Sequence, residues 1–199
     1  MKSRLIMALL ALVALTVSTA AFADTATMQF NGPSGNNANG EYTYPYEFTV
    51  NGNPMELMCI SLFNNVSNGQ TWMANVYSIA SLWGTQDAGL YDAAAWLFLQ
   101  EPSNGNDPAI NWAAWKLFYP GMDVSGVAGA DNWYAQAIGN TYTEGEFANV
   151  FLYQPTDFVR GGDSPQEFLG YQPVPEPNSL LLMGGGLIGA AGVLRRKLF

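Results

Sequence analysis

EYTYPYEFTVNGNPMELMCISLF (41–63) is the stretch that decides the fold. Aromatic and apolar residues alternate with smaller or polar ones along 41–50, which is the period of a half-buried strand. The NGN at 51–53 predicts a hairpin turn, because Asn and Gly adopt positive φ angles at little cost. The return strand, 55–63, is apolar on both faces, which indicates a central strand. Pro45 donates no ladder hydrogen bond, so we expect the first strand to lie at an edge or to carry a bulge.

The rest of the chain continues with strand, helix and strand patterns. Further strands are predicted at 71–79, 146–154 and, more weakly, 166–172. Helices are predicted at 87–100, 107–119 and 131–140, with Asp87, Asp107 and Asp131 as N-caps. This order predicts one α+β domain: a β-sandwich or barrel-like antiparallel core with a helical insertion.

The first 23 residues have the form of a secretory signal peptide. Two basic residues precede an apolar run at 5–17, and Ala21 and Ala23 supply the small side chains of a signal peptidase site. The run is shorter than the ~20 residues of a spanning helix. We expect cleavage after Ala23 and divide the chain into a signal peptide (1–23), an exported domain (24–172) and a C-terminal segment (173–199).

Charge and composition exclude several classes of function. The predicted exported domain holds 15 of the 16 acidic residues and only two cations, Lys116 and Arg160, so it repels nucleic acid. The chain has no histidine, which excludes Ser-His-Asp and Cys-His catalysis and histidine-based zinc sites. With Cys59 as its single cysteine, it forms no internal disulfide. We therefore expect no enzyme activity, no catalytic residue, no metal and no cofactor.

The C-terminal segment reads PVPEPNSLLLMGGGLIGAAGVLRRKLF. Its apolar run at 179–194 would measure about 24 Å as a helix, which barely spans the ~30 Å hydrocarbon core. The basic residues Arg195, Arg196 and Lys197 would stay on the cytoplasmic side. We expect a short transmembrane helix. A core helix, a dimerisation helix and a permanent tail anchor are the alternatives.

At these residues the chain resembles the PEP-CTERM sorting signal. The resemblance lies in the order of Val174, Pro175, Glu176 and Pro177, the Leu/Gly-rich run and the basic end. It implies cleavage near Pro-Glu-Pro by an exosortase-type enzyme in a Gram-negative envelope. It also implies an exported, structural protein that is transiently anchored in the inner membrane and associated with exopolysaccharide and biofilm.

A second resemblance links Cys59 to the INWAAW segment at 110–115. The two segments are similar to the thioester domains of bacterial surface adhesins, which cross-link a cysteine to a glutamine. Asn111 takes the position of that glutamine here and is one methylene shorter. The resemblance implies an alternative function, a covalent adhesin that uses Cys59 and Asn111. The other interpretation is that Cys59 is a small buried hydrophobic residue and Asn111 a hydrogen-bonded polar residue.

Closely spaced carboxylates suggest a third hypothesis, a glycosidase or calcium site. The pairs are Glu144 with Glu146, Asp87 with Asp92, and Asp157 with Asp163. None follows an EF-hand pattern, and carboxylates in loops are usually solvated.

Overall fold

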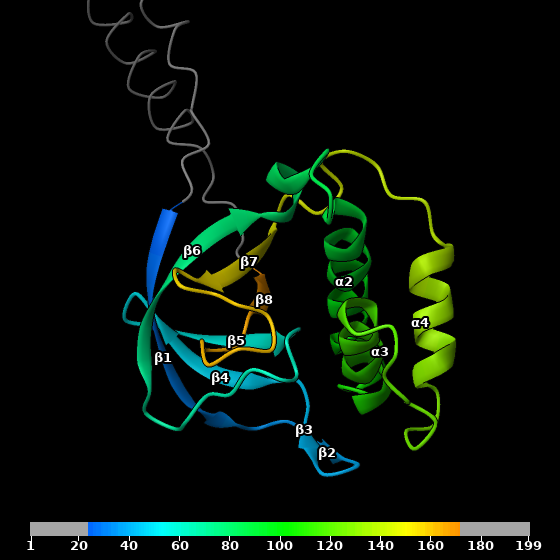
Figure 1. Cartoon of the computed structure of the whole chain (residues 1–199), viewed down its shortest axis with the longest axis horizontal. Coiled ribbons are helices and arrows are strands. Elements are labelled where there is room, and N and C mark those ends of the chain that lie inside the picture. The colour runs from blue at the N-terminus through cyan, green and yellow to red at the C-terminus, as the bar shows by residue number, and fades with distance from the viewer. Residues whose placement is uncertain (1–23, 172–199) are drawn as a thin grey trace, which may run out of the picture.

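A computed structural model of the chain describes residues 24–171 (Figure 1). Six strands close into an antiparallel barrel in the order β1-β4-β5-β8-β7-β6. They are β1 (Asp24–Pro33), β4 (Tyr46–Val50), β5 (Asn53–Cys59), β6 (Thr71–Ser78), β7 (Val150–Pro155) and β8 (Phe168–Tyr171). A separate small hairpin pairs β2 (Asn37–Ala38) with β3 (Glu41–Tyr42). The predicted antiparallel, barrel-like core is confirmed.

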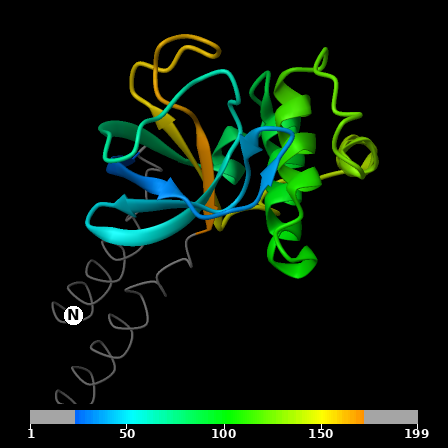
Figure 2. The ribbon, with the colours of Figure 1, turned by 90° about the horizontal axis from the view of Figure 1, so that it is seen from below.

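The helices form a layer on one side of this barrel (Figures 1 and 2). They are α2 (Ala88–Gln100), α3 (Pro108–Phe118) and α4 (Ala130–Gly139), with short 3-10 turns η1 (Ile79–Leu82) and η2 (Pro102–Asn104). All of them lie in the chain between β6 and β7, which pair directly with each other. The helices are therefore an insertion into the barrel, as predicted.

Only one of the three predicted N-caps forms. The Asp107 carboxylate accepts a hydrogen bond from the Ala109 N–H at 3.0 Å and caps α3. Asp87 precedes α2 but makes no side-chain cap bond. At α4 the N-cap is Gly129, whose φ of 94° suits a residue without a side chain. Asp131 lies inside the first turn of α4 instead and pairs with Lys116.

The edge-strand prediction for the first half of the hairpin is wrong. β4 pairs with β1 on one side and with β5 on the other. Pro45 is tolerated because it stands just before the strand and needs no ladder bond there. The turn is confirmed, with positive φ at Asn51 and Gly52. The return strand ends at Cys59 rather than at residue 63, because the chain turns away there and leaves Phe63 55% exposed.

Two hydrophobic clusters make up the core. The first fills the barrel with alternate side chains of its strands, and Phe168 stacks edge-on against Phe48 at a centroid distance of 4.6 Å. The second lies between the barrel's outer face and the helices. Helix α3 contributes to both, with the fully buried Trp115 in the first and Ile110 in the second. α3 is thus the element that joins the two layers.

The membrane-related predictions fall outside the described part of the chain. Within residues 24–171 no helix is both long and apolar enough to cross a membrane. The predicted signal peptide with Ala21 and Ala23, the predicted transmembrane helix at 179–194, and the whole sorting segment lie beyond these residues.

Candidate functional site

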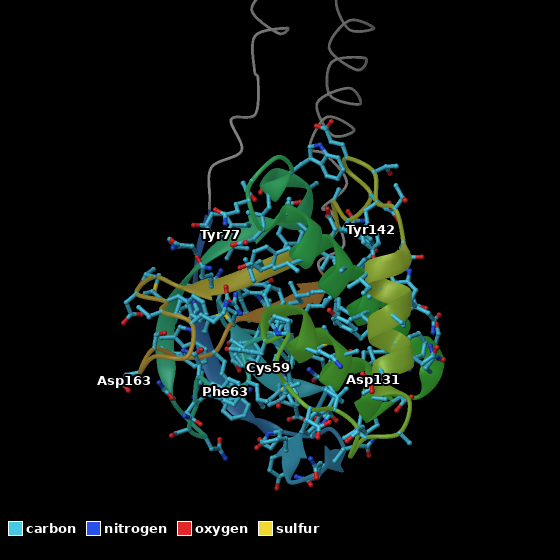
Figure 3. All side chains as sticks on the ribbon, turned by 45° about the vertical axis from the view of Figure 1, so that its right-hand side comes forward. Cys59, Phe63, Tyr77, Asp131, Tyr142 and Asp163 are labelled. Atoms are coloured by element: carbon cyan, nitrogen blue, oxygen red, sulfur yellow. The ribbon has the colours of Figure 1, made fainter. Side chains whose placement is uncertain are left out.

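The two residues that the sequence paired, Cys59 and Asn111, are both buried and meet through the backbone carbonyl of Cys59. Figure 3 labels Cys59 in the interior of the domain. Cys59 is the last residue of β5, and Asn111 lies in the first half of α3. The Asn111 Nδ2 donates to the carbonyl of Cys59 at 2.8 Å. The Asn111 Oδ1 accepts from the backbone N–H of Tyr44 at 2.9 Å. One amide thus ties α3 to two segments of the hairpin, and we call this arrangement the Asn111 clamp.

The Asn111 clamp provides hydrogen-bond partners for two backbone groups that the β4–β5 ladder leaves unpaired. Tyr44 stands before β4 and Cys59 stands at the end of β5, so neither group continues the ladder between these strands. All three residues are buried, and an unpaired backbone group there would cost about 1–3 kcal/mol. The clamp is therefore a stabilising feature with a clear energetic reason.

The Cys59 thiol is free and completely buried. Burial raises its pKa to about 12, and a hydrogen bond from the backbone of Ser61 opposes this only in part. A thiol with such a pKa is neutral at physiological pH, and the thiolate is the form that attacks electrophiles or binds metals. Asn111 uses its amide on two backbone groups, one of them the Cys59 carbonyl. The geometry therefore matches the non-covalent interpretation and gives the thioester resemblance no support.

A second polar group surrounds Glu167, which is fully buried just before β8. Its Oε1 accepts from the Tyr91 hydroxyl at 3.1 Å and from the Gln154 Nε2 at 2.7 Å. Its Oε2 forms an ion pair with Arg160, whose guanidinium lies 4.3 Å from the ring centre of Phe118. Burial raises the pKa of Glu167, and Arg160 opposes that shift. This Glu167 cluster holds the loop between β7 and β8 against α2 and α3.

Glu101, directly after α2, is the most unusual carboxylate in the described chain. It is 1% exposed, and neither of its carboxylate oxygens has a hydrogen-bond partner among residues 24–171. Burial raises its pKa, and together with the smaller effect of the Asp107 carboxylate brings it to about 9. Its place at the helix C-terminus also disfavours a negative charge. Glu101 is therefore neutral at pH 7 in the folded protein.

Of the three carboxylate pairs named from the sequence, Asp87 stands at the start of α2, and Asp92 within α2 is buried, which raises its pKa. Glu146 accepts hydrogen bonds from the N–H and hydroxyl of Thr143. Asp157 and Asp163 are exposed in the loop between β7 and β8. Across residues 24–171 no group of three or more His, Cys, Asp or Glu side chains is placed to hold a metal ion.

Comparison with known proteins adds one decisive observation outside the described domain. The family model for the PEP-CTERM protein-sorting motif matches residues 173–197. This chain carries a PEP-CTERM sorting motif. The matched span contains Val174, Pro175, Glu176 and Pro177 and the basic residues Arg195, Arg196 and Lys197. The PEP-CTERM motif marks an exported envelope protein that is anchored transiently in a membrane and processed by an exosortase. Neither the curated proteins nor the solved structures contain a match to this chain.

Sequence reasoning missed that three carboxylates of residues 24–171 are buried, among them Glu167 and Glu101. Arg160 was noted only for its charge, and nothing in the local pattern indicated its pairing with Glu167. For Glu101 the one available signal was its position at the end of an apolar helix. Both depend on tertiary neighbours that are distant in the sequence.

We predict that Asn111→Ala lowers the free energy of unfolding by about 2–5 kcal/mol, because it leaves two buried backbone groups unpaired. Asn36→Ala is the matched control, since the exposed Asn36 amide also bonds a backbone carbonyl, that of Asn106. It should cost less than about 1 kcal/mol. Urea denaturation measures both values. Equal effects would contradict a stabilising role for the Asn111 clamp.

From the raised pKa of Glu101 we predict that the free energy of unfolding depends on pH. Its pKa is raised from 4.5 to about 9 in the folded state, so the unfolded chain releases its proton first as pH rises. Its contribution to stability is therefore complete below pH 4.5 and is lost between about 4.5 and 9, by ~1.4 kcal/mol per pH unit at most. Glu101→Gln should remove this slope and stabilise the protein at pH 8, whereas the exposed control Glu47→Gln should not. If the free energy of unfolding changed with pH in the same way in wild type and in Glu101→Gln, the assignment of Glu101 as a buried, neutral group would be refuted.

Proposed function

We propose that this protein is a non-catalytic, structural component of the cell envelope or extracellular matrix, associated with exopolysaccharide in a biofilm. The observation that carries the proposal is the PEP-CTERM motif at residues 173–197, which directs an exported protein to an exosortase. The motif follows directly on a domain whose reactive side chains serve packing. We infer a route from signal peptidase cleavage after Ala23, through transient anchoring by residues 179–194, to release at the cell surface.

The chemistry of the domain supports a non-catalytic role. The chain has no histidine, and the buried Cys59 thiol has its pKa raised to about 12. Both cations of the predicted exported domain are engaged in ion pairs, Lys116 with Asp131 and Arg160 with Glu167. Catalysis by a cysteine, a histidine or a free cation would need that side chain to be present and accessible. These residues are committed to the fold instead.

The surface chemistry supports a neutral, hydroxyl-rich matrix partner over a polyanion. With 15 acidic residues and two cations, the predicted exported domain repels nucleic acid and anionic polysaccharide. Aromatic side chains are exposed at Trp83 (43%) and Phe63 (55%), and rings of this kind offer apolar faces for the CH surfaces of sugars. Neutral exopolysaccharide is therefore the partner that we propose.

We predict that the double substitution Glu176→Ala/Pro177→Ala blocks tail removal and keeps the protein in the inner-membrane fraction. The reason is that these residues form the centre of the matched motif. The control is Glu144→Ala/Pro120→Ala, which changes the same residue types at exposed positions of the folded domain. Fractionation and intact-mass measurement in a host with an exosortase give the answer. Normal processing and release of the motif variant would disprove the sorting role.

A further inference from the structure

The folded domain ends almost at the sorting motif. Tyr171 is the last residue of β8 and still pairs with Val150, and the matched motif begins at residue 173. Pro175 lies four residues beyond Tyr171, which an extended chain covers in at most about 14 Å. An enzyme that holds Pro-Glu-Pro in its active site must therefore come close to the surface around Tyr171.

The order of the strands allows the domain to fold before the enzyme acts on the motif. β8 is the last strand in the chain, yet it lies between β5 and β7 and closes the barrel. All strands are thus available as soon as Tyr171 has been exported, just as the motif follows. Signal peptidase, in contrast, cuts beside the first strand of the domain, because β1 begins at Asp24, immediately after the predicted cleavage site.

A groove of about 760 Å³ opens beside Tyr171, between the C-terminal end of α2 and the β4–β5 hairpin. Its lining includes Tyr171, Leu99, Pro102, Pro54, Tyr44 and Glu56. Tyr171 is 48% exposed and Leu99 40% exposed, so apolar side chains on both sides of the groove face solvent. The groove therefore offers apolar contacts to a partner on both of its sides.

The polar part of the groove restricts the partner further. Glu56 is exposed and accepts the Tyr44 hydroxyl at 3.4 Å, and no lysine or arginine lines the groove. The complementary partner therefore presents an apolar surface with a cation opposite Glu56.

We propose that this Tyr171 groove is the surface on which the exosortase-type enzyme docks while it holds the Pro-Glu-Pro segment. The inference rests on the proposed processing of the motif and adds the domain's own contribution to it. The short tether selects this occupant, since the enzyme must reach a segment within about 14 Å of the groove. The domain is then part of the enzyme's substrate, and the groove contact adds binding energy to that of the motif.

The test compares Leu99→Asp with Ile138→Asp in the full chain, in a host that contains the exosortase. Leu99 on α2 and Ile138 on α4 are both exposed apolar helix residues, at 40% and 56%, but only Leu99 lines the groove. Leu99→Asp should slow tail removal about tenfold, the effect of losing one important interface residue, and Ile138→Asp should leave the rate unchanged. Thermal melts confirm that both variants fold.

Inserting a flexible linker shows whether a processing defect of Leu99→Asp comes from lost docking or from another effect of the substitution. With about 15 Gly/Ser residues inserted between Gln172 and Pro173, the enzyme reaches the motif without meeting the groove. Wild type and Leu99→Asp should then be processed at equal rates. The proposal is overturned if Leu99→Asp is processed like wild type without the linker, or if its defect persists with it. A wild-type chain that keeps its tail would instead refute the proposed function itself.

Photo-crosslinking from position 99 identifies the occupant directly. A covalent adduct with the exosortase supports the proposal, provided that the same probe at position 138 gives none. An adduct with the chain's own C-terminal segment, with a second copy or with polysaccharide in place of the enzyme overturns it, and so does the absence of any adduct.

Discussion

The buried amide of Asn111 is the interaction on which the arrangement of the two layers depends. It fixes α3 to the carbonyl of Cys59 and to the N–H of Tyr44, which lie at the same end of the β4–β5 pairing, the end away from the turn. From this position α3 inserts Trp115 into the barrel cluster and packs Ile110 against the second cluster. A chain with no internal disulfide depends on such contacts for its stability, and here a polar bond fixes the position from which the apolar ones follow.

Charge is distributed in a way that agrees with a structural role. The two cations of the domain neutralise Asp131 and the buried Glu167, and most other carboxylates remain in solvent. Asp92 and Glu101 are the exceptions, since both are buried. Burial and the carboxylate of Asp107 keep Glu101 neutral by raising its pKa to about 9. The result is an acidic exterior around an interior whose polar groups are largely committed to internal bonds. Such a surface favours solubility and repels polyanions.

Local patterns in the sequence were sufficient for much of the fold, and tertiary neighbours explain the errors. The hairpin around 51–53 and the helical insertion were predicted, and the thioester resemblance implied the proximity of Cys59 and Asn111. β1 was missed because its second half merges into a Gly/Asn-rich stretch, although Ala26, Met28 and Phe30 are buried in strict alternation. The edge-strand prediction failed because β1 pairs with β4. The Glu167 cluster joins four segments that no local pattern relates.

The central claim is that the Cys59–Asn111 junction is a non-covalent clamp in a domain that is delivered to the cell surface rather than a reactive site. Intact mass together with thiol alkylation of the exported, folded protein tests this most directly. The account predicts that no ammonia is lost, and that Cys59 reacts with the alkylating reagent only after unfolding, because the thiol is completely buried. A mass lower by one ammonia, with no thiol to alkylate after unfolding, would contradict the account and establish a crosslink.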